Sequence, residues 1–145
     1  MQLFSHVWSF FLYIYALKVR IMILIIEDDE IDVLINERMI NKYQGNIKRV
    51  IAKNGSEADN ILNELAASGN FPEKIILDLI MPIMDGFQFL DMYASKFYPK
   101  YPETKIYVLT SSIHPADSKR TNMYPFVGGH VIKPLSAAGI KEIFD

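Results

Sequence analysis

Short apolar runs alternate with amphipathic stretches over most of the chain. Met22 to Ile26 is wholly apolar, which is typical of a parallel strand buried on both faces. Similar runs predict four further strands, at Ile47–Ala52, Ile75–Leu77, Ile106–Leu109 and Val131–Ile132. Helical spacing and capping signals predict helices to about Tyr43, from Asn54, from Asp85, from Pro115 to Met123 and from Ser136 to Phe144. This order predicts an α/β fold, with a five-stranded parallel sheet and helices on both faces.

Residues 1–20 form an apolar extension that precedes the predicted domain, residues 21–145. Leu3 to Leu17 is almost wholly apolar and aromatic, and Lys18 and Arg20 follow it. A membrane-spanning helix needs roughly 20 apolar residues, and a signal peptide carries its positive charge before the apolar stretch. Three interpretations stay open: a membrane anchor, an extra helix packed on the domain or a partner, and a start codon assigned too early, because Met22 opens a complete strand.

Composition narrows the class of protein. The 145 residues suit one domain, and a net charge of −2 gives no electrostatic basis for direct nucleic-acid binding. The absence of cysteine excludes disulfides, thiol nucleophiles and cysteine metal sites, and it suits the cytoplasm. Because nothing follows the last helix, we expect no attached output domain.

Polar residues follow four of the apolar runs at the point where each strand ends. Glu27 and Asp28 follow the first run, Asp78 the third, Thr110 the fourth and Lys133 the fifth. The carboxyl ends of the strands form the ligand-binding edge of open α/β sheets, so we expect these side chains to meet at one rim.

These residue types suit phosphoryl chemistry. Clustered carboxylates repel one another unless a cation joins them, and oxygen ligands suit Mg²⁺. A carboxylate can act as a nucleophile that forms an acyl phosphate, while a metal ion and a lysine neutralise charge on the phosphoryl group. A hydroxyl can hydrogen-bond the phosphoryl oxygens.

The neighbouring acids allow a simpler interpretation. Asp29, Glu30 and Asp32 are assigned to stabilising a helix start through its dipole, at about 0.3–1 kcal/mol each. A shift of one residue would move the metal pair from Glu27–Asp28 to Asp28–Asp29. Asp85 is assigned to capping the following helix.

At these residues the chain resembles the receiver domains of bacterial two-component signalling. The stretch Asp78 to Gly86, DLIMPIMDG, matches that family's D-x-x-M-P-x-M-D-G loop around the acceptor aspartate. The acidic pair after the first strand, Thr110-Ser111 and Lys133-Pro134 match as well, over about Met22 to Asp145. The resemblance implies a flavodoxin-like receiver fold and a phospho-accepting signalling switch, not an enzyme beyond its own phosphorylation and slow dephosphorylation.

The resemblance also implies roles for individual residues. Asp78 is the phosphoacceptor, Lys133 contacts the phosphoryl group, and Thr110 is the switch hydroxyl beside the small Ser111. Mg²⁺ is held by Glu27, Asp28, Asp78 and the backbone carbonyl of Ile80. Pro134 is expected to follow a cis peptide bond.

The resemblance also implies phosphate donors and a surface that changes on phosphorylation. Family members take phosphate from a histidine kinase or phosphotransfer protein and hydrolyse it slowly themselves. We expect the readout at the Pro115–Met123 helix, the last strand and the last helix, toward an unidentified downstream protein or by onward transfer of phosphate.

Two positions depart from the family pattern. His130 stands where the family usually has Tyr or Phe, three residues before the lysine, and its polar ring can titrate near neutral pH. Ile80 is apolar where a polar residue is common, and we hypothesise that it shields the phosphoryl group from water.

Two other functions are weighed against the switch. A receiver-like interaction module that does not cycle phosphate is the main alternative, favoured by His130 and the extension. A nucleotide- or flavin-binding domain is disfavoured, because neither G-x-G-x-x-G nor G-x-x-x-x-G-K-[ST] is present.

Overall fold

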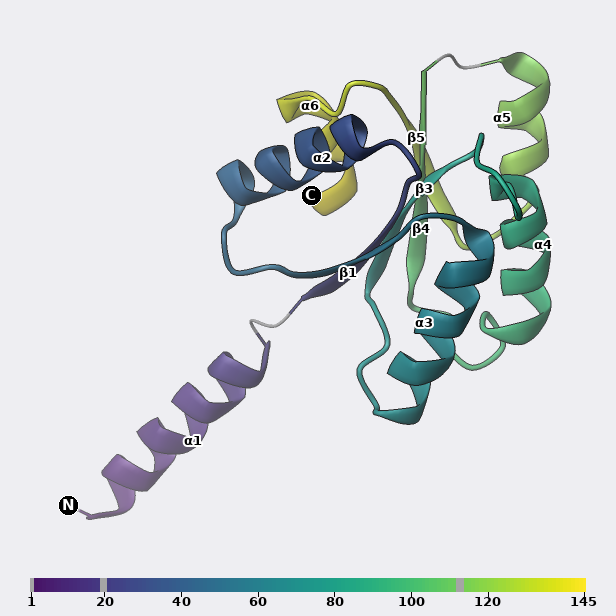
Figure 1. The fold of residues 1–145 in the computed structure, drawn as a ribbon. Coiled ribbons are helices and arrows are strands. Elements are labelled where there is room, and N and C mark those ends of the chain that lie inside the picture. The colour runs from purple at the N-terminus through teal and green to yellow at the C-terminus, as the bar shows by residue number, and fades with distance from the viewer. Residues whose placement is uncertain (1, 19–20, 112–113) are drawn as a thin grey trace.

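A parallel sheet forms the centre of the protein. The computed structural model describes residues 2–18, 21–111 and 114–145. The strands in these residues are β1 (Met22–Ile26), β2 (Lys48–Ala52), β3 (Lys74–Asp78), β4 (Lys105–Thr110) and β5 (Val127–Ile132). In this described part they pair in parallel as a five-stranded sheet, in the order β2-β1-β3-β4-β5 (Figure 1). The predicted α/β class and parallel sheet are therefore confirmed.

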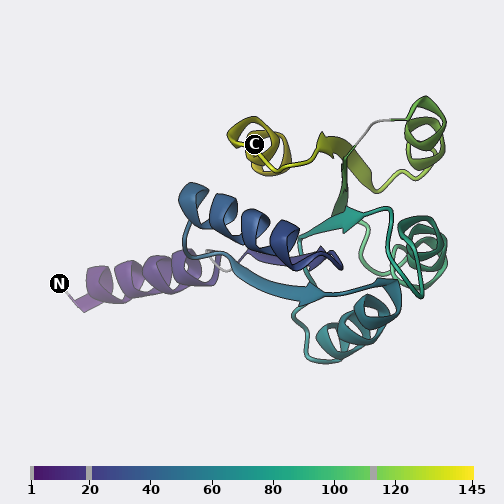
Figure 2. The same ribbon diagram turned by 45° about the horizontal axis from the view of Figure 1, so that its top comes forward.

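Helices cover both faces of the sheet (Figures 1 and 2). One face carries α2 (Glu30–Tyr43) and α6 (Ala137–Phe144), and the other carries α3 (Gly55–Ala67), α4 (Gly86–Lys96) and α5 (Pro115–Thr121). Successive side chains of a strand point to opposite faces. Ile23 and Ile25 of β1 accordingly pack with α2 and α6, whereas Leu24 and Ile26 pack with α3 and α4. A buried layer on each face holds the strand ends in fixed positions.

The last strand is longer than predicted. It begins at Val127, not at Val131, and ends at Ile132. Gly128 and Gly129 carry no side chain, so they hide the apolar pattern that marks a strand. A Cβ at Gly128 would lie 3.0 Å from the ring of Tyr107, and the β4–β5 register shifts beside this tyrosine. The helix predicted to reach Met123 ends at Thr121.

The apolar extension forms a helix, α1 (Gln2–Lys18), that lies apart from the sheet (Figures 1 and 2). Its large apolar residues from Val7 to Tyr13 are 49–69% exposed, so this part of α1 does not pack on the domain. None of the helices in the described residues is long and apolar enough to cross a membrane. Arg20, which the sequence pairs with Lys18 as a basic flank, lies outside the described residues.

Candidate functional site

The predicted site residues meet where the strand connections reverse direction. From β1 the chain runs to β2 at one edge of the sheet, and from β3 it runs to β4 on the other side. Such a switch point leaves a crevice beyond the carboxyl ends of the two central strands. Glu27 and Asp28 directly follow β1, and Asp78 is the last residue of β3.

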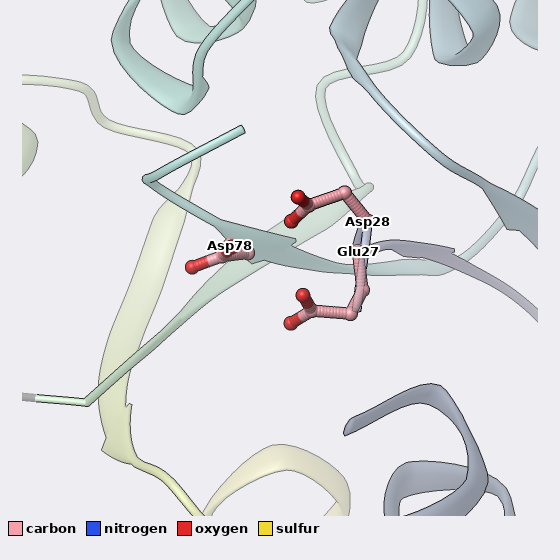
Figure 3. A group of neighbouring side chains, drawn as sticks. All are labelled: Glu27, Asp28 and Asp78. Carbon is pink, nitrogen blue, oxygen red and sulfur yellow. The ribbon is translucent and has the colours of Figure 1, made fainter. Parts of the chain in front are cut away.

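Three carboxylates form a cluster at these strand ends. Glu27, Asp28 and Asp78 each offer one carboxylate oxygen, and these oxygens all lie within 4.8 Å of one another (Figure 3). Glu27 and Asp78 are buried, whereas Asp28 is exposed. The Asp29 carboxylate instead accepts hydrogen bonds from the backbone N–H groups of Ile31 and Asp32, which caps α2. The geometry therefore favours Glu27–Asp28 over Asp28–Asp29 as the pair that joins Asp78.

Burial makes the cluster costly to ionise. It raises the pKa of Glu27 to about 7, although the nearby Lys133 ammonium and the hydrogen bond from the backbone N–H of Asp29 act in the opposite direction. Burial also raises the pKa of Asp78, against the lowering effects of the Lys133 ammonium and the Ile80 backbone N–H. Neighbouring carboxylates add to both shifts. A cation bound among these oxygens would relieve the repulsion.

Lys133 supplies positive charge to the cluster. Its Nζ lies 2.6 Å from Glu27 Oε2, 2.9 Å from Asp32 Oδ2 and 3.5 Å from Asp78 Oδ1. Lys133 donates a hydrogen bond to the Asp32 carboxylate. Its contact with Glu27 Oε2 is an ion pair without hydrogen-bond geometry. Burial alone would lower the pKa of Lys133, but its acidic partners more than offset this and raise it. The lysine is therefore held in its charged form beside Asp78.

The sequence predicts for Asp32 only a helix-stabilising role, and the structure adds a contact with Lys133. Asp32 lies in the first turn of α2, and its carboxylate reaches Lys133, 101 residues further along the chain. The pattern of acids at a helix start looks the same whether or not one of them faces a site. Only the contact with Lys133, which directly follows β5, distinguishes Asp32 from Glu30.

Thr110 and Lys133 reach the same rim from β4 and β5. The backbone N–H of Lys133 donates to the carbonyl of Thr110 over 2.8 Å, which fixes the two residues side by side. Asp78 pairs in register with Leu109, so Thr110 extends one residue beyond the acceptor position. The predicted cis peptide bond between Lys133 and Pro134 is present.

The loop after Asp78 depends on a close approach at Gly86. The Gly86 N–H donates to the Leu79 carbonyl over 3.0 Å, and a Cβ there would lie 2.6 Å from Leu79 Cα. Glycine thus lets the start of α4 press against the end of β3. Asp85 caps α4 with a reciprocal capping box, which confirms its assigned role. The Ile80 side chain is 78% exposed, and the metal-binding role of its carbonyl stays a prediction.

His130 contacts the helix that packs beside its strand. Its Nε2 and the hydroxyl of Thr121 on α5 form a hydrogen bond. Burial lowers the pKa of His130, which Glu142 on α6 partly opposes. The ring therefore links β5 to α5 in a largely neutral form at neutral pH.

Comparisons with known proteins agree on one family. Residues 23–145 match the model of the family described as response regulator receiver domain. A two-component response regulator from Cytophaga hutchinsonii is 29% identical with a TM-score of 0.80, over 86% of this chain and 95% of that one. One from Legionella pneumophila is 30% identical with a TM-score of 0.72, over 86% and 95%. The Mn²⁺-bound form of the response regulator Rcp1 is 22% identical with a TM-score of 0.67, over 84% and 88%, and so shows a shared fold. No curated protein matches the chain.

Proposed function

The chain belongs to the response regulator receiver family, and from this premise we propose that it is a molecular switch that accepts a phosphoryl group on Asp78. The observation that carries the proposal is the convergence of three carboxylates and a partly buried, charged lysine at the end of β3. Neither a structural ion pair nor a capped helix needs all four groups at one point.

The donor set fits Mg²⁺. Glu27, Asp28 and Asp78 offer only oxygen atoms, and Asp28 is open to solvent, which suits an ion that keeps several waters. These residues, with the Ile80 carbonyl, would hold the ion. When bound, Mg²⁺ supplies positive charge to the phosphoryl oxygens. The Mn²⁺ of Rcp1 belongs to that protein, so the proposal here rests on the carboxylates of this chain.

The proposed transfer is a displacement at phosphorus. An oxygen of the ionised Asp78 carboxylate forms a bond to the phosphorus, and the bond from phosphorus to the donor nitrogen or oxygen breaks. The leaving group keeps the electron pair and takes a proton from solvent. Lys133 balances charge on the transferred group, and the Thr110 hydroxyl donates a hydrogen bond to it, so the product is an aspartyl phosphate.

The proposed donor is a phosphohistidine of a histidine kinase or phosphotransfer protein. Phosphorylation would then alter the surface formed by α5, β5 and α6, because Thr110 ends β4, before α5, and Lys133 directly follows β5, before α6. His130, bonded to Thr121, lies between β5 and α5 on this route. The changed surface would bind a downstream protein, or Asp78 would pass its phosphate onward. The fold and the charge suit a cytoplasmic protein that does not bind nucleic acid directly.

Intact-mass spectrometry tests the proposal. The protein is incubated with a small phosphodonor, with and without Mg²⁺, beside Asp78→Asn and a matched control, Glu30→Gln. We expect one phosphate-sized mass gain that needs Mg²⁺, persists in the control and disappears in Asp78→Asn. Absence of any gain, with small donors and with histidine phosphotransfer proteins, would favour the non-cycling interaction module.

A further inference from the structure

Lys133 has three acidic partners in the described residues, and they are not equivalent. Glu27 and Asp78 belong to the carboxylate cluster, whereas Asp32 does not. We propose that Asp32 is a positioning residue that holds the Lys133 ammonium at the acceptor, independently of the groups that bind the metal. This inference rests on the proposed phosphoryl transfer and extends it to a residue of α2.

The start of α2 fixes Asp32 in place. The backbone N–H of Asp32 donates to the Asp29 carboxylate over 3.1 Å, and the N–H of Asp29 donates to Glu27 Oε1 over 3.1 Å. Asp32 is thus tied through two hydrogen bonds to the same cluster that its side chain faces. Its side chain is 28% exposed, against 13% for Lys133. Water reaches the pair only in part, so its charge interaction is screened less than that of a surface pair.

The three N–H bonds of an ammonium explain the need for a third acid. A cation among the cluster oxygens draws on Glu27 and Asp78, which leaves less negative charge for Lys133. Asp32 accepts a hydrogen bond from one N–H of the lysine. The other N–H groups then face Asp78 and the incoming phosphoryl oxygens. Without Asp32, Lys133 is drawn more strongly to Glu27 and Asp78 and competes there with the cation.

Asp32→Asn is therefore expected to weaken Mg²⁺ binding and to slow phosphorylation. Titration calorimetry with Mg²⁺ alone should give an affinity on the order of tenfold lower, as for other groups that orient a metal site from outside it. The phosphorylation rate should stay reduced at saturating Mg²⁺, because the lysine is no longer oriented. Glu30→Gln removes the same charge from the same helical turn without touching Lys133, and should change either quantity by less than about twofold.

A double-mutant cycle separates positioning from a general charge effect. In a Lys133→Gln background, Asp32→Asn should alter Mg²⁺ affinity no more than Glu30→Gln does. Asp32→Glu, which keeps the charge, should restore most of the affinity. Equal losses in Asp32→Asn and Glu30→Gln, additivity in the cycle, or a faster rate in Asp32→Asn would each overturn the inference.

Failure of this inference can be told apart from failure of the proposed function. If the wild-type protein gains no phosphate, the proposed function fails, whatever Asp32 does. If the wild-type protein is phosphorylated and Asp32→Asn matches it in Mg²⁺ affinity and rate, only the role of Asp32 fails. Thermal unfolding of each variant shows that the compared proteins are folded.

Discussion

Replacing Gly86 with alanine is expected to destabilise the protein at the acceptor loop. The added Cβ would lie 2.6 Å from Leu79 Cα and 2.7 Å from the Asp78 carbonyl oxygen. Both are backbone atoms at the end of β3, which is hydrogen-bonded to β1 and β4. Neither atom can rotate away as a flexible side chain can, so either the start of α4 or the end of β3 must move.

The magnitude follows from two opposed effects. Alanine is favoured over glycine inside a helix by about 1 kcal/mol, and by less at its first residue. Overpacking in a well-packed region costs about 1–3 kcal/mol, and immobile backbone neighbours place Gly86 at the upper end of that range. The free energy of unfolding should therefore fall by about 2 kcal/mol, which corresponds to a lower urea midpoint.

Urea unfolding followed by circular dichroism measures this difference, and Gly45→Ala is the matched control. A Cβ at Gly45 would meet only the Asn41 carbonyl oxygen, at 4.0 Å. That variant should be unchanged or up to about 1 kcal/mol more stable, because alanine restricts the unfolded chain. A Gly86→Ala protein that unfolds at or above the wild-type midpoint would refute the packing argument.

Three further predictions concern the site and its surroundings. Ile80→Asn should shorten the lifetime of the aspartyl phosphate, because an amide admits and orients water where the apolar side chain excludes it; an unchanged decay followed by mass spectrometry would contradict this. Lys133→Met should lower the free energy of unfolding by roughly 3 kcal/mol in metal-free buffer, since it leaves the buried carboxylates of Glu27 and Asp78 without a cation, and added Mg²⁺ should recover part of the loss. Burial lowers the pKa of His130 in the folded protein below its ordinary 6.5. The imidazole therefore binds a proton more readily in the unfolded chain, and the folded protein loses stability as the pH falls through 6.5. His130→Gln should lose less stability than wild type between about pH 7.5 and pH 5.5, and an NMR titration midpoint of His130 above 6.5 would disprove the effect.

Much of the fold could be predicted from the sequence because the strands are buried on both faces. Met22 to Ile26 is apolar at every position, since alternate residues serve the two core layers. The same reasoning failed at the start of β5, where Gly128 and Gly129 give no apolar signal and the neighbouring strand β4 supplies the pairing. A strand formed by tertiary pairing is invisible to a local pattern.

In the site, too, the sequence reveals residues that a local pattern places and misses contacts that depend on how distant elements pack. Glu27, Asp28 and Asp78 could be found because each directly follows an apolar run, and the parallel sheet brings such positions together. The contact between Asp32 and Lys133 could not be found, because it depends on how the start of α2 is placed relative to the residue that follows β5. The hydrogen bond between His130 and Thr121 depends in the same way on the placement of α5.

Chemical mapping of the phosphorylated residue tests the central claim most directly. Borohydride reduces an aspartyl phosphate to homoserine, and peptide mass spectrometry then identifies its position. After treatment with a phosphodonor and Mg²⁺, we expect homoserine at position 78 and none in the Mg²⁺-free sample. Phosphate on another residue, or homoserine formed equally without Mg²⁺, would contradict the assignment of Asp78 as a metal-dependent phosphoacceptor.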